Sequence, residues 1–161
     1  NILAAVCVGN YFGVASDKIN AAVEEYIPSN NRSQVVTKGN NTIILDCYNA
    51  NPTSMTAALV NFSGMKAKKK VAILGDMLEL GSESESLHRI VIEQVGSILA
   101  DEVILIGKEF TSALQKEKID CRNFATTDEA KEFLASHKFN DAAILVKGSR
   151  GSRLEKLFEV L

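Results

Sequence analysis

The segment Asp-Cys-Tyr-Asn-Ala-Asn at residues 46–51 places a carboxylate, a phenol and two carboxamides within a few positions of one another. It follows the apolar run at residues 42–45, which predicts a buried strand, and it precedes residues 55–60, whose composition is helical. Asn51 is a favourable helix N-cap, and Pro52 suits the first helical position because its missing N–H would be unpaired there anyway. Ligands of open α/β sheets bind at the carboxyl ends of strands, so this loop is a candidate binding segment.

Two further loops of the same kind follow apolar runs. Residues 75–81 read Gly-Asp-Met-Leu-Glu-Leu-Gly and come directly after residues 71–74. Residues 147–151 read Lys-Gly-Ser-Arg-Gly and come directly after residues 144–146. Each loop alone could be no more than a capped turn, but three of them at one edge of one sheet favour a binding site.

The side chains of the three loops are chemically complementary. Lys147 and Arg150 are suited to holding a carboxylate, and an arginine can do so with two parallel hydrogen bonds. The alternative for these two cations is a solvated helix start, which the helix dipole mildly disfavours. Asp46 and Asp76 could accept hydrogen bonds from ribose hydroxyls, an ammonium group or a metal-bound water. Arg32 is a lone cation before a strand, and composition alone does not assign it a role.

Other polar groups give weaker signals. Residues 147–149 resemble the end of a phosphate-binding P-loop in the wrong order, and the chain has no Gly-x-Gly-x-x-Gly fingerprint. His88 and His137 lie on amphipathic segments far apart in the sequence, and we predict both at the surface. Cys47 is interpreted as a packed thiol and not as a nucleophile, because no histidine lies near it in the sequence.

Composition and charge restrict the class of protein. The 161 residues are 46% hydrophobic and 24% charged, as in an ordinary globular domain, and the net charge of −2 gives no reason to expect nucleic acid or an anionic membrane as a partner. No apolar run approaches the roughly 20 residues that span a bilayer, so we predict no membrane insertion. Cys7, Cys47 and Cys121 show no C-x-x-C spacing, which predicts neither a disulfide framework nor a zinc site and indicates a reducing, cytoplasmic compartment.

Short apolar segments alternate with amphipathic ones along the chain. The Gly/Asn-containing turn at residues 38–41 joins two predicted strands as a hairpin. The alternation after it predicts an α/β fold with a Rossmann-like, doubly wound sheet that is mainly parallel and has one antiparallel edge strand. The predicted strands are residues 34–37, 42–46, 71–74, 103–106, 122–124 and 143–146. The predicted helices are residues 1–12, 17–26 with Ser16 as the cap, 53–65, 84–99, 110–116, 128–137 and 152–161.

The chain begins on Asn1 without an initiator methionine, and residues 2–8 start in the middle of an apolar helical pattern with no capping segment before it. We therefore expect a piece cut from a longer protein. In this interpretation residues 1–28 are two helices and a linker left from a preceding domain, and residues 29–161 are the α/β domain.

The three loops also match a known family. They read Asp-x-Tyr-Asn-Ala-Asn-Pro-x-Ser-Met-x-Ala-Ala at residues 46–58, Gly-Asp-Met-x-Glu-Leu-Gly at residues 75–81 and Val-Lys-Gly-Ser-Arg at residues 146–150. These patterns resemble the C-terminal domain of the MurF branch of the Mur ligase family, and the resemblance covers essentially the whole chain in the same order and spacing. Residues 1–5 are similar to the end of the element that closes the family's central ATPase domain, which would make residues 1–28 the helical tail of that domain.

The resemblance implies an ATP-dependent amide ligation in the cytoplasmic synthesis of peptidoglycan precursors. ATP phosphorylates the carboxylate of UDP-MurNAc-tripeptide, and the amine of D-Ala-D-Ala then attacks the acyl phosphate. ATP and Mg²⁺ are the implied cofactors, and these two substrates are the implied partners. The residues that would face the nucleotide are Asn1, Arg32, Asp46, Tyr48 and Asn49. The residues that would face the dipeptide or the reaction centre are Asn51, Asp76, Lys147, Ser149 and Arg150.

The family's P-loop, carbamylated lysine, magnesium ligands and UDP-binding N-terminal domain have no counterpart in this sequence. Without a phosphate cradle or a metal site, the charge that develops in phosphoryl transfer is not stabilised. The resemblance therefore implies that this chain supplies no metal ligand and is inactive by itself, although the longer protein would be a ligase.

Two alternatives stay open at this point. A free-standing doubly wound binding module, of the receiver or flavodoxin kind, would explain the alternation of strands and helices but not the three loops or the start within a helix. Another Mur-type ligase, such as a folylpolyglutamate synthase, would fit the fold but not the Lys-Gly-Ser-Arg sequence at residues 147–150.

Overall fold

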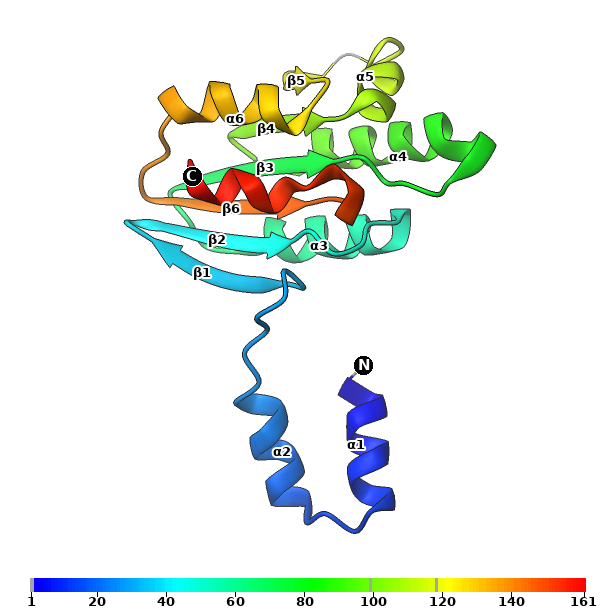
Figure 1. Cartoon of the computed structure of the whole chain (residues 1–161), viewed down its shortest axis with the longest axis vertical. Helices are drawn as coiled ribbons and strands as arrows, with labels where there is room; N and C mark the ends of the chain where they lie inside the picture. Colours follow the sequence, from blue (N-terminus) through cyan, green and yellow to red (C-terminus); the bar gives the residue numbers. More distant parts are fainter. Residues whose placement is uncertain (1, 99, 118) are drawn as a thin grey trace.

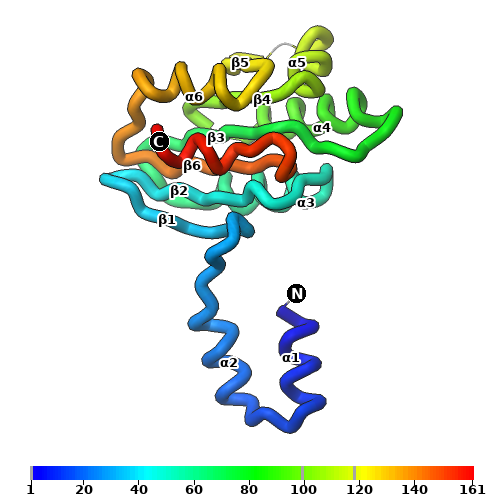
Figure 2. Tube along the Cα trace, in the orientation of Figure 1, coloured from blue at the N-terminus to red at the C-terminus, as the bar shows by residue number. Residues whose placement is uncertain are grey.

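The structure, a computed structural model, describes residues 2–98, 100–117 and 119–161. Figure 1 shows an α/β body and, apart from it, a pair of helices, α1 (Ile2–Tyr11) and α2 (Ser16–Glu24), joined to the body by an extended segment. The trace in Figure 2 runs from this helix pair into the body at the first strand, and the C-terminus lies on the body.

A six-stranded sheet forms the centre of the body, in the order β1-β2-β6-β3-β4-β5 (Figure 1). β1 pairs with β2 in antiparallel register, and the other neighbouring pairs are parallel. This arrangement confirms the predicted sheet, which is mainly parallel with one antiparallel edge strand. The strands are β1 (Gln34–Lys38), β2 (Asn41–Asp46), β3 (Lys69–Gly75), β4 (Glu102–Ile106), β5 (Arg122–Phe124) and β6 (Ala142–Lys147).

Helices cover both faces of the sheet because successive residues of its buried strands point to opposite faces and are apolar on both. In β6, Ala143 and Leu145 pack on one face, and Ile144 and Val146 pack on the other. The first face is covered by α3 (Pro52–Ser63), α4 (Ser84–Ser97), which the 3₁₀ turn η1 (Gly81–Glu83) precedes, and α5 (Lys108–Leu114). The second face is covered by α6 (Thr127–Ser136) and the C-terminal segment with its 3₁₀ helices η2 (Arg150–Ser152) and η3 (Leu154–Glu159).

The C-terminal segment differs from its prediction. The sequence predicts one α-helix over residues 152–161, whereas the structure has two short 3₁₀ helices. Arg153 between them has a φ of 53°, a left-handed conformation that a right-handed α-helix does not accept. Leu154 and Leu157, three residues apart, are both fully buried, which suits the three-residue repeat of a 3₁₀ helix. The prediction of an α-helix here is therefore wrong.

The start of α2 also differs from its prediction. The helix begins at Ser16 itself, after Ala15, and no side chain caps it, so Ser16 is not the cap. The helix ends at Glu24, earlier than predicted.

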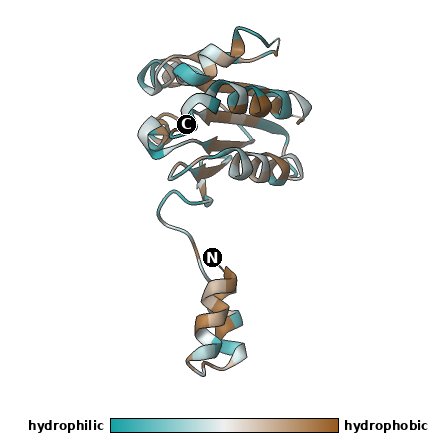
Figure 3. Cartoon of the chain, turned by 90° about the vertical axis from the view of Figure 1, so that its right-hand side faces the viewer, coloured by the Kyte–Doolittle hydropathy of each residue, from teal (hydrophilic) through white to brown (hydrophobic). Residues whose placement is uncertain are grey.

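Helix α1 buries none of its residues, and Figure 3 shows that it is largely hydrophobic. Leu3 and Tyr11 are 80% and 84% exposed. The assignment of residues 1–28 to a separate helical tail stays a prediction. Among the helices that the structure describes, none is both long and apolar enough to cross a membrane.

Two glycines allow the ends of β3 and β6 to pack closely. A Cβ atom on Gly75 or on Gly148 would lie 2.8 Å from Leu154 Cδ1, too close for a packed side chain. Leu154 therefore packs directly against both strand ends, and the loop after β6 lies next to the loop after β3.

Asn51 caps α3, as the sequence predicts. Its Oδ1 accepts a hydrogen bond from the Ser54 N–H at 2.8 Å, and Ser54 Oγ accepts one from the Asn51 N–H at 3.1 Å. We expect Asn51→Ala to lower the free energy of unfolding by about 0.5–2 kcal/mol, measured by chemical denaturation. The control is Asn61→Ala at an exposed position of the same helix, which should change it by less than about 0.5 kcal/mol. Equal effects of the two variants would show that the cap contributes nothing.

Candidate functional site

The three polar loops meet at one edge of the sheet. β6 lies between β2 and β3, and its last residue, Lys147, is in register with Asp46 of β2 and with Leu74 of β3. The loops that follow these strands begin side by side, as the sequence predicts.

Lys147 is buried and paired. Its Nζ lies 2.6 Å from Asp46 Oδ2 and donates a second hydrogen bond to the carbonyl oxygen of Asn49 at 3.3 Å, while 1% of the side chain is exposed. The other carboxylate oxygen of Asp46 accepts from the N–H of Ser33 at 3.1 Å. A buried ammonium group needs such partners because its lost hydration is otherwise uncompensated. A solvated helix start is therefore the wrong interpretation of Lys147.

The Tyr48 ring lies close to two guanidinium groups. The Cζ atom of Arg32 is 3.6 Å from the centre of the Tyr48 ring, and that of Arg150 is 5.5 Å from it. The polar interaction with Arg32, followed by the charges of Arg32 and Arg150, lowers the pKa of the Tyr48 hydroxyl. Beside this ring is a hollow of about 280 Å³, here called the Tyr48 hollow, lined by Arg32, Asp46, Tyr48, Asn49, Ser54 and Lys147.

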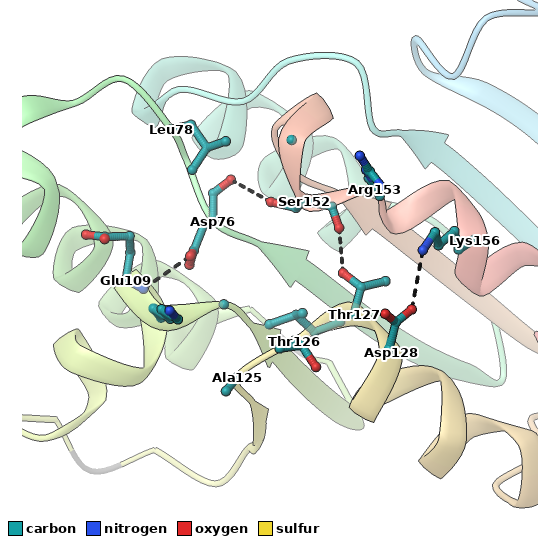
Figure 4. Close-up of a pocket in the computed structure, with 14 residues that line it drawn as sticks. Asp76, Leu78, Glu109, Ala125, Thr126, Thr127, Asp128, Ser152, Arg153 and Lys156 are labelled. Carbon is teal, nitrogen blue, oxygen red and sulfur yellow. Dashed lines mark hydrogen bonds and ion pairs between the residues drawn. The ribbon is translucent and has the colours of Figure 1, made fainter.

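A larger hollow of about 420 Å³, here called the Asp76 pocket, lies at the carboxyl ends of β3, β4 and β5 (Figure 4). Its walls come from the loop after β3, the starts of α5 and α6, and the C-terminal segment. In Figure 4, Lys156 extends from the C-terminal segment toward α6 and contacts Asp128 at 3.4 Å, and Arg153 of the same segment also lines the pocket. The sequence reasoning missed both cations, because a predicted α-helix gave no reason to place either of them at the sheet edge.

The carboxylate of Asp76 is already bonded to the backbone. Its Oδ1 accepts from the N–H of Phe110 at 3.0 Å, and its Oδ2 accepts from the N–H of Glu109 at 3.1 Å, at the start of α5. Burial raises the pKa of Asp76, and these two hydrogen bonds oppose the increase. Gly107 makes the approach possible, because a Cβ atom there would lie 2.1 Å from Asp76 Oδ2, and its φ is 124°. The Asp76 carboxylate therefore joins the loop after β3 to the start of α5.

Ser149 joins the loop after β6 to the loop after β3. Its N–H donates to the carbonyl oxygen of Asp76 at 3.1 Å, and its Oγ accepts from the N–H of Leu78 at 2.9 Å. Ser149 is itself buried. The conformations of the two loops therefore depend on each other.

The structure divides the predicted site residues into two groups. Arg32, Asp46, Tyr48, Asn49, Lys147 and Arg150 gather at the Tyr48 hollow, and Asp76 and Ser149 lie together at the other side of the β6 loop. Arg150 and Lys147, assigned with Asp76 to the dipeptide, are thus beside the residues assigned to the nucleotide. Asn51 uses its side-chain oxygen as the helix cap, and Asn1 lies outside the described residues. The ligand that each residue binds stays a prediction.

His88 is fully buried on α4, so its predicted surface position is wrong. Its Nε2 accepts a hydrogen bond from the N–H of Met77 at 3.0 Å. Helical periodicity could have found it, because His88 shares one face with Val91, Ile92 and Val95 at spacings of three, four and seven residues.

Within residues 2–98, 100–117 and 119–161, no group of three or more His, Cys, Asp or Glu side chains is placed to hold a metal ion.

The sequence model of the family described as "Mur ligase, glutamate ligase domain" matches residues 31–150. The chain is 34% identical over 166 residues to the UDP-N-acetylmuramoyl-tripeptide–D-alanyl-D-alanine ligase of Treponema pallidum, covering 100% of the chain and 36% of that protein. It is 32% identical over 172 residues to the ligase of the same name from Bacillus subtilis, covering 100% of the chain and 37% of that protein. The chain thus spans little more than a third of these relatives.

Solved structures give the same result. MurF from Acinetobacter baumannii superposes with a TM-score of 0.86 at 29% identity, covering 98% of the chain and 36% of that protein. MurF from Thermotoga maritima in complex with ADP superposes with a TM-score of 0.78 at 25% identity, covering 96% and 35%. A bifunctional folylpolyglutamate synthase/dihydrofolate synthase from Yersinia pestis reaches a TM-score of 0.64 at 14% identity, over 91% of the chain and 34% of that protein, and shares the fold alone.

We expect Asp76→Asn to destabilise the protein by about 1–3 kcal/mol at neutral pH, because one side of the new amide is an NH₂ group facing a backbone N–H donor. Chemical denaturation measures the change. The matched control is Asp128→Asn in the same pocket. The Asp128 side chain is 79% exposed, so this substitution should lower the free energy of unfolding by less than about 0.5 kcal/mol. If both variants are equally stable, the hydrogen bonds to α5 do not hold the loop.

We expect the three cysteines to differ in their reactivity toward a thiol reagent. Cys47 is buried, its Sγ donates to the carbonyl oxygen of Val146 at 3.3 Å, and desolvation raises its pKa to about 12. At about pH 8 the exposed Cys7 should react first, the half-buried Cys121 later, and Cys47 only after denaturation. Mass spectrometry of the labelled peptides measures the order, and rapid labelling of Cys47 in the folded protein would contradict the packing described above.

Proposed function

Because the chain belongs to the Mur ligase family, we propose that it is the C-terminal domain of an ATP-dependent ligase of the MurF type. The longer enzyme would join D-Ala-D-Ala to UDP-MurNAc-tripeptide in the cytoplasmic synthesis of peptidoglycan precursors. The observation that carries this proposal is the meeting of three polar loops at one sheet edge in a chain that aligns over its full length with ligases of that name.

We assign the Tyr48 hollow to the nucleotide. A partly exposed aromatic ring close to the guanidinium groups of Arg32 and Arg150 suits a ligand that has both a flat base and anionic phosphates. The Asn49 side chain at the same hollow adds a neutral hydrogen-bonding group for the ribose. Lys147 contributes less charge than its type suggests, because Asp46 neutralises it.

We assign no magnesium ligand to this chain. The carboxylate of Asp46 is bonded to Lys147 and Ser33, and the carboxylate of Asp76 is bonded to two backbone N–H groups. Both carboxylates are thus already engaged by hydrogen-bond donors of the protein, which leaves each with fewer lone pairs for a metal ion.

We assign the Asp76 pocket to the dipeptide. Its volume of about 420 Å³ falls in the range of small-molecule sites. Arg153 and Lys156 supply positive charge for the carboxylate of D-Ala-D-Ala, and Lys156 is only weakly engaged with Asp128 at 3.4 Å. This assignment replaces Lys147 and Arg150, the cations assigned from sequence, with two that line the pocket itself.

The chain's contribution to the reaction is to bind and to orient. ATP would phosphorylate the carboxylate of the UDP-linked tripeptide, and the amine of D-Ala-D-Ala would attack the acyl phosphate, releasing phosphate and forming the amide bond. Because the β6 loop borders both hollows, it could hold the dipeptide amine at a fixed distance from the nucleotide, and such positioning lowers the barrier. The cations at the two hollows would hold the anionic ends of the two ligands.

The first test compares two arginines in the full-length ligase. Arg153→Gln should raise the KM for D-Ala-D-Ala by roughly 10- to 100-fold and spare the KM for ATP, because a charge-assisted hydrogen bond to the carboxylate is lost. Arg150→Gln should do the reverse. Steady-state kinetics with each substrate varied would measure both effects. If Arg150→Gln weakens the dipeptide and Arg153→Gln does not, the assignment of the Asp76 pocket is wrong and the sequence-based assignment is right.

The second test assays this chain alone. We expect no ADP release from ATP with UDP-MurNAc-tripeptide and D-Ala-D-Ala, because the sequence holds no P-loop and the described residues hold no metal cluster. The full-length ligase is the control, and its ADP release should require both substrates. Turnover by the chain alone would contradict the prediction, and ADP release that ignores D-Ala-D-Ala would contradict the proposed function.

A further inference from the structure

The backbone partners of His88 fit a neutral ring in one tautomer, and Asp76 Oδ1 is a further neighbour of its Nε2 at 3.8 Å. Its Nδ1 lies 2.7 Å from the carbonyl oxygen of Ser84, which can only accept a hydrogen bond, so Nδ1 carries the proton. Its Nε2 faces the N–H of Met77 at 3.0 Å, which can only donate, so Nε2 is unprotonated. The ring has no exposed surface, and the Phe110 ring packs edge-on to it with 4.7 Å between the ring centres.

These contacts belong to a hydrogen-bond network that closes on itself. The Ser84 hydroxyl donates to the carboxylate of Glu109, and the N–H of Glu109 donates to the carboxylate of Asp76. The backbone from Asp76 to Met77 then leads back to His88. The network joins the loop after β3, the first turn of α4 and the first turn of α5. Figure 4 shows the Asp76–Glu109 contact of this network at the pocket.

The backbone of residues 76–78 is thus held from two sides. The β6 loop holds it through Ser149, which bonds the Asp76 carbonyl and the Leu78 N–H. Helix α4 holds Met77, the residue between Asp76 and Leu78, through the hydrogen bond from the Met77 N–H to His88. Asp76 and Leu78 both line the Asp76 pocket, whereas Met77 points into the core. Because Met77 is joined directly to both pocket residues, fixing its amide restricts the backbone conformations that Asp76 and Leu78 can adopt.

We propose that His88 is a positioning residue for the dipeptide site. It accepts the Met77 N–H and so holds residues 76–78 in the conformation that shapes one wall of the Asp76 pocket. The expected effect of His88 on D-Ala-D-Ala binding rests on the proposed function. The expected effect of His88 on the conformation of residues 76–78 does not.

Two near-isosteric variants of the full-length ligase separate the two ring nitrogens. His88→Gln can place a carbonyl oxygen near the Nε2 position and keep an acceptor for Met77. His88→Asn can place its NH₂ group near the Nδ1 position, keep the bond to Ser84 and leave the Met77 N–H unpaired. His88→Asn should raise the KM for D-Ala-D-Ala about tenfold and change the KM for ATP by less than about twofold, whereas His88→Gln should stay within about twofold of the wild type for both.

The control is His137→Asn. His137 directly follows α6 and its Nε2 lies 3.0 Å from Glu102 Oε1, and neither residue lines the Asp76 pocket. This variant should leave both KM values unchanged. A tenfold effect of His137→Asn would mean that loss of any histidine–carbonyl or histidine–carboxylate contact affects the enzyme, and would overturn the specific role of His88.

Measurements on this chain give a readout that does not depend on the ligase reaction. Nitrogen NMR should find Nδ1 of His88 protonated and Nε2 unprotonated. Hydrogen exchange at the Met77 amide should be slow in the wild type and in His88→Gln, and faster in His88→Asn. An Nε2-protonated tautomer, or equal Met77 exchange in the three proteins, would overturn the proposal.

The outcomes also separate this proposal from the proposed function. If the wild-type ligase does not use D-Ala-D-Ala, the proposed function is wrong, and Met77 exchange alone decides the role of His88. If the ligase uses the dipeptide and folded His88→Asn binds it normally, the proposed function stands and the positioning role is wrong. If His88→Asn does not fold, a wild-type KM in His88→Gln supports the role and a tenfold increase in His88→Gln overturns it.

Discussion

The ion pair between Lys147 and Asp46 is the interaction on which the arrangement of the site depends. The parallel register of β2 and β6 puts the two residues opposite each other, and Lys147 is almost wholly buried. A buried ammonium group is tolerated only with close anionic and hydrogen-bonding partners, so the pair ties the end of β6 to the end of β2. From this fixed point the loop after β6 separates the Tyr48 hollow from the Asp76 pocket. Arg150 of that loop lies beside Tyr48, while Ser152 and Arg153 border the Asp76 pocket.

Much of the fold follows from patterns that are local in the sequence. The apolar runs, the Gly/Asn hairpin turn and the Asn51 cap with Pro52 after it all predict the elements that the structure contains. The convergence of the three loops also follows, because parallel strands end at the same edge of a sheet. The C-terminal segment could not be predicted in the same way, because its 3₁₀ helices depend on a left-handed Arg153 and on the seating of Leu154 against two glycines.

The pairing of side chains within the site was harder to predict than the loops that carry them. Lys147 and Arg150 looked like two free cations because residue type alone does not reveal a partner on another strand. In the structure, the carboxylate of Asp46 neutralises the charge of Lys147, and Arg150 lies near the aromatic ring of Tyr48. His88 was missed for the opposite reason, since a polar residue on an amphipathic helix was assumed to face solvent, although its spacing from Val91, Ile92 and Val95 matches the buried face.

A crystal structure of the full-length ligase with a non-hydrolysable ATP analogue and D-Ala-D-Ala would show whether the loop after β6 separates a nucleotide site from a dipeptide site, as proposed above. We expect the nucleotide against Arg32, Tyr48 and Arg150, and the dipeptide in the Asp76 pocket with its carboxylate at Arg153 or Lys156. A dipeptide carboxylate bound by Arg150 beside Tyr48, with no ligand in the Asp76 pocket, would contradict this expectation.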